Sequence, residues 1–374
     1  MELAGIIIQK IRENGPISFR DFMEMALYYP GLGYYTSPFD KIGVSGDYYT
    51  SSSLTPAYGA MIGRQLEEMW CILGAETFTI VEYGAGNGAL CHDILSYLKN
   101  NRRFYDSLNY CIIEKSPVMR KMEKAHLVEK VSWYDSIRDI SGITGCILSN
   151  ELVDNFPVHK VEMGDELMEV LVDYKDGFVE ALRPASENLK EYLDELNIVL
   201  PKGFRTEINL EAIAWVKEIS ACFKKGYLLT IDYGYNSSEL YCERRNQGTL
   251  ICYHKHNISD RLYDDIGAQD ITAHVNFSAL HHWGFKNGLH FNGYTNQANF
   301  LLALGLTDHL KKITVQEPGN YINYKKEAFI KRKLLVDMGN KFKVLIQQKD
   351  APIQKLSGLK LSDARLEYAE SSSF

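Results

Sequence analysis

Residues 81–89, Val-Glu-Tyr-Gly-Ala-Gly-Asn-Gly-Ala, carry the strongest chemical signal in the sequence. They follow a short apolar run and precede a helical pattern, so we expect them to connect a buried strand to a helix. Glycines let the backbone turn sharply and approach a ligand, and the helix N-terminus presents free N–H groups to an anion. We therefore predict that Gly84, Ala85, Gly86 and Gly88 bind the anionic part of a cofactor.

The glycine loop by itself fits two cofactors. Its residues also match the Gly-x-Gly-x-x-Ala fingerprint of dinucleotide-binding proteins, with Ala89 at the third small position. Glu82 favours S-adenosylmethionine, because a carboxylate here would oppose a dinucleotide's pyrophosphate but suits the ammonium and sulfonium charges of S-adenosylmethionine. The methionine carboxylate would then be the anion at the helix N-terminus. A tight turn that binds no ligand is the third alternative.

Two further acids follow the next two predicted strands. Glu114 ends the second strand, 26 residues after Gly88, where the ribose hydroxyls of either cofactor need a bidentate acceptor. By the same argument we predict that Asp135, after the third strand, accepts a hydrogen bond from the adenine amine. Each acid taken alone could be a solvated surface carboxylate, and only its pairing with the glycine loop favours binding.

Polar residues also follow the fourth strand, where residues 149–157 read Ser-Asn-Glu-Leu-Val-Asp-Asn-Phe-Pro. Open α/β sheets bind ligands at this carboxyl edge. Glu151 and Asp154 lie three residues apart, so one helical turn would place both carboxylates on one side, able to clamp a guanidinium or take a proton from an amine. We predict these two acids as catalytic residues and Asn150 as a cofactor contact. First-turn acids that complement a helix dipole are the alternative.

An alternation of strands and helices would position these residues. Short apolar strands separated by helices predict an α/β fold with a doubly wound, mostly parallel sheet and right-handed crossovers. The predicted core strands are 78–83, 110–114, 131–133, 145–149, 226–232 and 342–347, and the predicted helices are 57–73, 89–100, 117–125, 215–223 and 295–304.

Three segments lie outside this alternation. Residues 1–55 are expected to form an N-terminal cap of two short helices and a Tyr- and Gly-rich stretch. The tyrosines at 28–35 predict a wall around a bound molecule, with packing under a long loop as the alternative. Residues 56–374 would form the main domain, with insertions at about 160–212 and 234–280 that build a substrate or partner subdomain. Antiparallel strands around Asp176-Gly177 are expected in the first insertion.

Composition argues against several functions. The net charge is -7, the sequence pI is near 5.9 and no block of Lys or Arg stands out, so no nucleic-acid partner is expected. No apolar run reaches membrane-spanning length and the N-terminus lacks a basic region, so we expect a cytoplasmic protein. The seven cysteines lack the spacing of a zinc or redox site. His254 and His256 have no third ligand at metal spacing, so no metal is predicted.

Six stretches of the sequence occur in an order that resembles a known family. They are residues 46–50, 81–88, 150–159, 231–234, 248–250 and 270–275. In this combination the sequence resembles the MidA family, the bacterial relatives of the mitochondrial complex I assembly-factor methyltransferases, over about residues 15–305. The family usually continues the first stretch with a small residue, Pro and Glu, whereas Ser51-Ser52-Ser53-Leu54 follow here.

The resemblance implies a class I S-adenosylmethionine-dependent methyltransferase with a Rossmann-like fold. It implies that Gly84, Gly86 and Gly88 contact the cofactor and that Glu114 binds the ribose. It also implies a protein substrate, because the mitochondrial relatives are regarded as protein arginine methyltransferases that act on a respiratory complex I subunit. A homodimer is a further expectation.

Two alternatives to a methyltransferase stay open at this point. An NAD-dependent oxidoreductase would use the same glycine turn and would bind NADH in preference to S-adenosylhomocysteine. A non-catalytic assembly factor would keep the fold and bind a partner through residues 160–280. The favoured function is methyl transfer from S-adenosylmethionine to a protein acceptor, in which the enzyme mainly orients a nucleophile about 3 Å from the methyl group.

Overall fold

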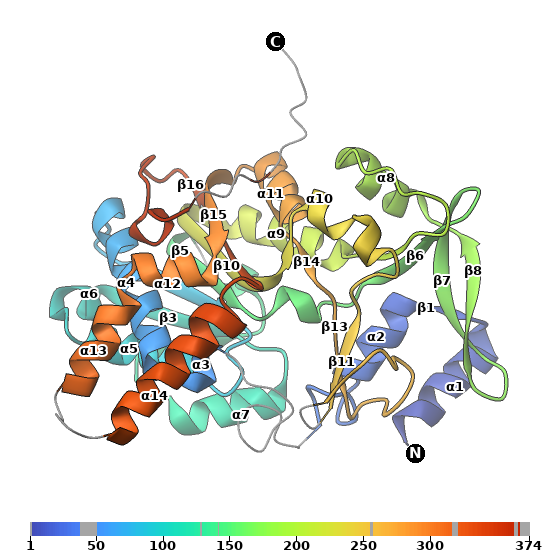
Figure 1. Ribbon diagram of the computed structural model, residues 1–374, viewed down its shortest axis with the longest axis horizontal. Helices are drawn as coiled ribbons and strands as arrows, with labels where there is room; N and C mark the ends of the chain where they lie inside the picture. The colour runs from blue at the N-terminus through green and yellow to red at the C-terminus, as the bar shows by residue number, and fades with distance from the viewer. Residues whose placement is uncertain are drawn as a thin grey trace, which may run out of the picture.

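A mostly parallel sheet of eight strands forms the centre of the computed structural model (Figure 1), which describes residues 2–37, 51–127, 129–140, 142–254, 257–315, 321–362 and 366. Five neighbouring strands run parallel, and the antiparallel strands lie at one edge. The strand order is β15 (His290–Asn296), β16 (Phe342–Lys349), β10 (Phe223–Tyr235), β5 (Ile143–Asn150), β2 (Phe78–Tyr83), β3 (Leu108–Ile113) and β4 (Val131–Tyr134), and β14 (Val275–Asn276) pairs with β10.

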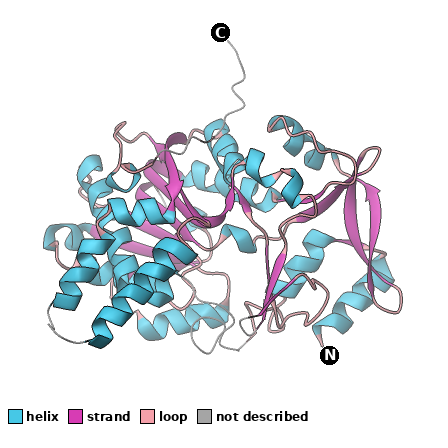
Figure 2. Ribbon diagram, viewed as in Figure 1, coloured by secondary structure: helices cyan, strands magenta, loops and turns pink. Residues whose placement is uncertain are grey.

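Helices cover both faces of this sheet, as Figure 2 also shows, so the predicted doubly wound α/β architecture is confirmed. One apolar core joins the first face to α4 (Pro56–Leu73), α5 (Ala89–Leu98), α6 (Arg102–Ser107), α12 (Gln297–Ala303), α13 (Leu306–Val315) and α14 (Tyr321–Lys331). A second core joins the opposite face to α9 (Leu210–Cys222) and α11 (Phe277–Lys286). Shorter or peripheral helices are α3 (Ser51–Leu54), α7 (Pro117–His126) and α10 (Ser237–Leu240).

The N-terminal cap consists of α1 (Leu3–Asn14) and α2 (Phe19–Tyr28), which confirms the two predicted helices. Ser18 caps α2 by accepting a hydrogen bond from the N–H of Asp21 at 3.1 Å. Just before α2, the short strand β1 (Ile17–Ser18) pairs with β7 (Leu167–Tyr174) of the first insertion. The cap is thus joined to an insertion that follows it by about 150 residues in the sequence.

The first insertion builds a second sheet from β6 (His159–Met163), β7, β8 (Phe178–Pro184) and β9 (Arg205–Ile208), with α8 (Glu187–Glu195) beside it. The predicted hairpin around Asp176-Gly177 is confirmed, because β7 and β8 pair antiparallel across this turn. In Figure 1 this sheet and the cap lie together at the end of the molecule away from α13 and α14. A shared apolar core of the cap, β7 and the second insertion holds them there.

The second insertion contains a three-stranded antiparallel sheet in the order β12 (Asn257–Ser259), β11 (Ile251–His254) and β13 (Asp270–Thr272). It is tied to the main sheet where β5 ends, since the N–H of Ala273 donates to the carbonyl oxygen of Asp154 at 2.9 Å. Both insertions therefore meet at the carboxyl edge of the parallel strands.

One core element differs from its prediction. The helix expected from Thr295 begins at Gln297, and residues 290–296 form strand β15. Thr295 pairs with Val344 of β16, and the side chain of Asn296 caps the helix by accepting the N–H of Asn299 at 2.8 Å. The apolar helical pattern begins only after residue 297. The strand before it is stabilised by pairing with β16, which the local sequence does not indicate.

Two glycines allow the central strands to lie close together. Gly145 of β5 and Gly226 of β10 have φ values of +150° and +137°, which residues with a side chain rarely adopt. A Cβ on Gly145 would overlap the carbonyl oxygen of Thr79 in β2, and a Cβ on Gly226 would overlap that of Gly145. The spacing of β2, β5 and β10, whose ends carry the site, therefore requires both glycines.

Replacing Gly145 with alanine should destabilise the fold by at least about 2 kcal/mol, because the added methyl group meets backbone atoms that cannot move independently. Urea denaturation followed by circular dichroism measures the change. Gly177→Ala is the matched control, since a Cβ there meets no atom within 4 Å. An unchanged midpoint for Gly145→Ala would contradict the packing argument.

Candidate active site

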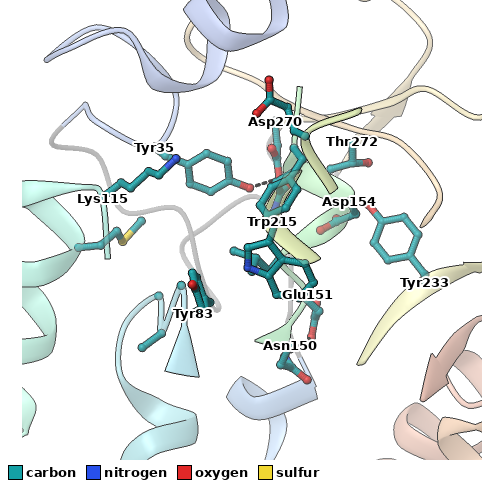
Figure 3. Close-up of a pocket in the computed structure, with 18 of the residues that line it drawn as sticks. Tyr35, Tyr83, Lys115, Asn150, Glu151, Asp154, Trp215, Tyr233, Asp270 and Thr272 are labelled. Atoms are coloured by element: carbon teal, nitrogen blue, oxygen red, sulfur yellow. Dashed lines mark hydrogen bonds between the residues drawn. The ribbon is translucent and has the colours of Figure 1, made fainter. Parts of the chain in front are cut away.

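A cavity of about 970 Å³ opens where β2, β3, β5 and β10 end, which is the size and position expected of a small-molecule site in an α/β sheet. We distinguish two parts of it. The loop half is lined by residues 82–87 and 113–116, and the aspartate half is lined by Asp154, Tyr233, Asp270, Thr272 and His274. Figure 3 shows the labelled residues of both halves around one space.

The loop half is built on the glycine turn between β2 and α5. Gly84, Gly86 and Gly88 have φ values of +65°, +60° and +80°, so all three use the conformation that favours glycine. A Cβ on Gly84 would lie 2.8 Å from the side chain of Leu152, so the turn also fits closely against the segment after β5. Gly84, Ala85 and Gly86 line the cavity, whereas Gly88 lies outside the lining and begins α5.

Two carboxylates stand in the wall of the loop half, the buried Glu82 and the partly buried Glu114. Glu82 accepts a hydrogen bond from the hydroxyl of Tyr110 at 2.7 Å, and Glu114 accepts one from the N–H of Ser116 at 2.6 Å. Burial is the main cause that raises the pKa of each acid to about 7. A ligand that brings hydroxyl donors or a positive charge would favour the ionised form of both.

Asp135 does not reach the cavity. Its side chain is 87% exposed and forms an ion pair with Arg120 at 2.7 Å, and it is absent from the lining residues. The structure therefore gives no support to the predicted adenine contact, because Arg120, on α7, holds this carboxylate at the surface.

Asn150 and Glu151 end β5 and line the cavity. Asn150 accepts a hydrogen bond from Tyr58 at 2.6 Å, and Glu151 Oε1 accepts from the backbone N–H of Ser51 at 3.0 Å. Burial raises the pKa of Glu151 to about 8. Ser51, where the sequence departs from the resembled family, thus supplies a backbone donor to Glu151.

The helical turn expected to align Glu151 with Asp154 does not form. Glu151 has a φ of +55° and lies before the single 3₁₀ turn, Val153–Asn155. Of the two acids, only Asp154 is part of that turn. The cause is the sheet, since the N–H of Glu151 still donates to the carbonyl oxygen of Ile231 in β10 at 2.9 Å. The two carboxylates share the cavity but leave the backbone in different directions (Figure 3).

Asp154 is the principal acid of the aspartate half. Its side chain is 4% exposed, and its Oδ1 has no hydrogen-bond partner among the described residues. The phenol of Tyr233 points toward it (Figure 3). Burial raises the pKa of Asp154 to about 7. A buried carboxylate oxygen that faces a cavity is expected to receive a donor or a cation from a ligand.

Asp232, at the end of β10, fixes the turn that carries Asp154. Its Oδ2 accepts the backbone N–H groups of Leu152, Val153 and Asp154 at 3.1, 2.9 and 3.3 Å. The residue is fully buried. Sequence reasoning did not assign it a role, although it opens the stretch 231–234 on which the family resemblance partly rests; only the fold shows that it caps a turn from another strand.

Tyrosines from the cap close the cavity on another side, which confirms the predicted tyrosine wall for Tyr28 and Tyr35. Their rings stack with centroids 5.5 Å apart. Tyr28 donates to the carbonyl oxygen of Asn155 at 3.2 Å, and Tyr35 donates to Asp270 Oδ2 at 2.9 Å. Residues 46–50, the first stretch of the family resemblance, lie outside the described residues.

Tyr83 and Trp215 form a further wall that the sequence did not reveal. Their rings meet edge to face at 5.7 Å and both line the cavity. The Tyr83 hydroxyl and the Trp215 indole N–H are buried without hydrogen-bond partners among the described residues. Trp215 lies on α9, for which the sequence predicted only a helix over residues 215–223.

Only one histidine of the pair, His254, lies in the described part of the chain. His254 lies 3.2 Å from Asp265, and His256 falls outside the described residues. Among the residues that the structure describes, no group of three or more potential ligands could hold a metal ion.

No described helix is long and apolar enough to cross a membrane.

The loop half fits S-adenosylmethionine on its own geometry. Gly84, Ala85 and Gly86 line this half directly at the end of β2, and α5 begins at the edge of the same turn, where a helix N-terminus favours an anion. Glu114 and Glu82 both line this half, as expected of a ribose acceptor and of an acid near an ammonium or sulfonium group.

Comparisons with known proteins agree with this fit. Residues 61–295 match the model of a family described as "Putative S-adenosyl-L-methionine-dependent methyltransferase". The chain is 28% identical to the Caenorhabditis elegans "Protein arginine methyltransferase NDUFAF7 homolog, mitochondrial", in an alignment 350 positions long that covers 83% of this chain and 78% of the other.

Two solved structures from Burkholderia thailandensis have the same fold. One contains S-adenosyl-homocysteine and is 31% identical, with a TM-score of 0.85 over 96% of this chain and 94% of that one. The other, a native structure, is also 31% identical, with a TM-score of 0.83 over 95% and 93% of the two chains.

The fold and the site define a class I methyltransferase that uses S-adenosylmethionine as its cofactor. Within that class, the chain belongs to the S-adenosylmethionine-dependent methyltransferase family whose model it matches, and the resemblance to the MidA family is confirmed. The NAD-dependent oxidoreductase is thereby set aside.

Replacing Glu114 with glutamine should weaken S-adenosylhomocysteine binding by at least about tenfold at pH 8, because a charged hydrogen-bond acceptor for the ribose is lost. Isothermal titration calorimetry gives the dissociation constant. Asp135→Asn is the control and should bind like the wild type, since Asp135 points away from the cavity. Equal losses in both variants would show that Glu114 is not the ribose acceptor.

Proposed function

We propose that this methyltransferase modifies arginine side chains of a protein acceptor, with Asp154 as the residue that holds the guanidinium group. The observation that carries the proposal is Asp154 itself, a buried acid that lines the cavity beside the phenol of Tyr233 and has no cationic partner among the described residues. A guanidinium group has five N–H donors in one plane and matches a carboxylate in charge and geometry.

The surroundings of Asp154 support a positively charged acceptor. The partly buried Glu151 and the buried Asp270 also line the cavity, together with Tyr28, Tyr35 and Tyr233. Aromatic faces and carboxylates together stabilise a cation that has left water. The curated relative from Caenorhabditis elegans carries the name of a protein arginine methyltransferase, which agrees with this acceptor class. A respiratory-complex subunit is the first protein acceptor that we would test.

The proposed reaction exchanges one bond for another. S-adenosylmethionine, when bound, supplies a methyl group on a positively charged sulfur. The N–CH₃ bond forms as the S–CH₃ bond breaks and leaves a neutral thioether, and the proton that the acceptor nitrogen loses passes through a cavity carboxylate to water. Asp154 would orient the guanidinium and localise its positive charge on the nitrogens that do not react. Glu151, whose Oε1 accepts hydrogen bonds from Ser51 and Asn150, would contact the acceptor from another wall of the cavity.

Replacing Asp154 with asparagine should lower kcat/KM for an arginine-containing acceptor at least about 100-fold, because a buried charged hydrogen bond is lost in the transition state. Tritium transfer from labelled S-adenosylmethionine, with identification of methylarginine after hydrolysis, measures the activity. S-adenosylhomocysteine should bind this variant within about twofold of the wild type. Asp165→Asn, at an exposed position of the first insertion, is the control.

Full turnover by Asp154→Asn would remove Asp154 from the mechanism. Methyl transfer by the wild type to a residue other than arginine would refute the acceptor class. Cofactor binding without transfer to any protein of a cell extract would instead favour the non-catalytic assembly factor.

The raised pKa of Asp154 also predicts how stability depends on pH. An acid whose folded pKa lies near 7, above its unfolded value near 4, favours the folded state while it is protonated and destabilises it as pH rises from about 4 to about 7. Asp154→Asn should therefore stabilise the ligand-free protein at pH 8 by at least about 1 kcal/mol and change it little at pH 4. Urea denaturation at both values checks the sign; destabilisation at pH 8 would contradict it.

A further inference from the structure

We propose that Tyr35 is a positioning residue that connects the two halves of the cavity, so that cofactor binding fixes Asp270 for a cationic acceptor. The role of Asp270 toward an acceptor rests on the proposed function. The connection itself rests only on contacts between described residues, and a separate measurement tests it.

A continuous set of hydrogen bonds joins Glu114 to Asp270. Glu114 Oε1 accepts the N–H of Ser116 at 2.6 Å, and the hydroxyl of Ser116 donates to the carbonyl oxygen of Tyr35 at 2.7 Å. The phenol of the same tyrosine donates to Asp270 Oδ2 at 2.9 Å (Figure 3). Tyr35 thus contacts the loop half through its backbone and the aspartate half through its side chain.

Packing restricts Tyr35 to this position. Its ring stacks on Tyr28 at 5.5 Å and meets Tyr34 edge to face at 5.0 Å. Tyr28 is itself held by its hydrogen bond to the carbonyl oxygen of Asn155, next to Asp154. The backbone of Tyr35 is tied to α2 as well, since its N–H donates to Leu27 at 2.8 Å. A shift of the Ser116 loop is therefore passed to the phenol rather than absorbed by a loose side chain.

Asp270 is the acid that this connection controls. It begins β13, is 2% exposed and lines the cavity. Its sheet meets the turn of Asp154 through the hydrogen bond from Ala273 to the Asp154 carbonyl oxygen. The two aspartates thus stand on adjoining walls, one from the core sheet and one from the second insertion. A planar cation with donors on two edges can contact both.

The consequence is a coupling between two binding events. Glu114 is the expected ribose acceptor, so a bound cofactor would order the Ser116 loop and, through Tyr35, the carboxylate of Asp270. Each ligand then lowers the cost of ordering the residues that the other requires, which makes the two bind cooperatively. The second insertion would respond to the cofactor without touching it.

Hydrogen–deuterium exchange with and without S-adenosylhomocysteine tests the connection, and it needs no acceptor. In the wild type, saturation should slow exchange in the peptides that cover residues 28–37 and β13, by at least about threefold. Tyr35→Phe removes the hydrogen bond from the phenol to Asp270 but keeps the one from Ser116 to the carbonyl oxygen of residue 35. In this variant the cofactor should therefore still protect residues 28–37 but should no longer protect β13. In Ser116→Ala protection of both segments should be lost.

Tyr29→Phe is the matched control, because Tyr29 lies in the same segment but does not line the cavity. It should behave like the wild type. S-adenosylhomocysteine should bind Tyr35→Phe within about twofold of the wild type, which separates a lost connection from a lost cofactor site. Absence of protection at β13 in the wild type, or the same protection in Tyr35→Phe, would overturn the proposal.

A kinetic arm separates this inference from the proposed function. With N-acetyl-arginine amide as the probe, Tyr35→Phe should raise the acceptor KM at least about fivefold at saturating S-adenosylmethionine, and because coupling is reciprocal it should also raise the KM for S-adenosylmethionine at saturating acceptor. If the wild type methylates no arginine but shows coupled protection of β13, the acceptor class is wrong and the connection stands. If it methylates arginine and Tyr35→Phe has a normal acceptor KM, the connection is wrong and the acceptor class stands.

Discussion

The site depends on one buried carboxylate that never faces the ligand. Asp232 accepts three successive backbone N–H groups after β5, and these would otherwise be left unpaired in a place without water. The turn they form sets Asp154 at the cavity, and it also presses Leu152 against Gly84 of the cofactor loop. One side chain at the end of β10 thus fixes the relative position of the cofactor loop and the acidic turn, which belong to two other strands. An aspartate is suited to this task because its short side chain places one oxygen within reach of all three N–H groups.

Local sequence patterns correctly predicted those parts of the molecule whose structure depends on residues that lie close together in the sequence. The alternating strands and helices, the glycine turn and the hairpin at Asp176-Gly177 all follow from periodicity and backbone preference within short segments. Glu114 and Asp154 could be placed in the cavity because parallel strands end at a common edge. Asp135 does not line the cavity, because that rule locates a residue but not its rotamer, and the carboxylate forms an ion pair with Arg120.

Residues that act across long separations could not be found in this way. Tyr35 meets Asp270 across 235 positions of sequence, and Asp232 meets the turn of residues 152–154 from another strand. Trp215 has the spacing of an ordinary core residue, and only the tertiary fold turns it toward the cavity. The direction of Glu151 also depends on a distant partner, because pairing with Ile231 extends the strand and delays the expected turn.

The pairing of β1 with β7 has a consequence for how the chain is made. Ile17 and Ser18 leave the ribosome long before Val172 and Leu171, their strand partners, are synthesised. The apolar faces of α1 and α2 pack against β7 and the second insertion, so they stay uncovered until more than two thirds of the chain has emerged. The glycine turn, in contrast, needs only residues up to β5 for its nearest strand neighbours. The nascent protein can therefore shape its nucleotide pocket early, whereas the acceptor pocket is completed late and its unfinished walls are natural targets for chaperones.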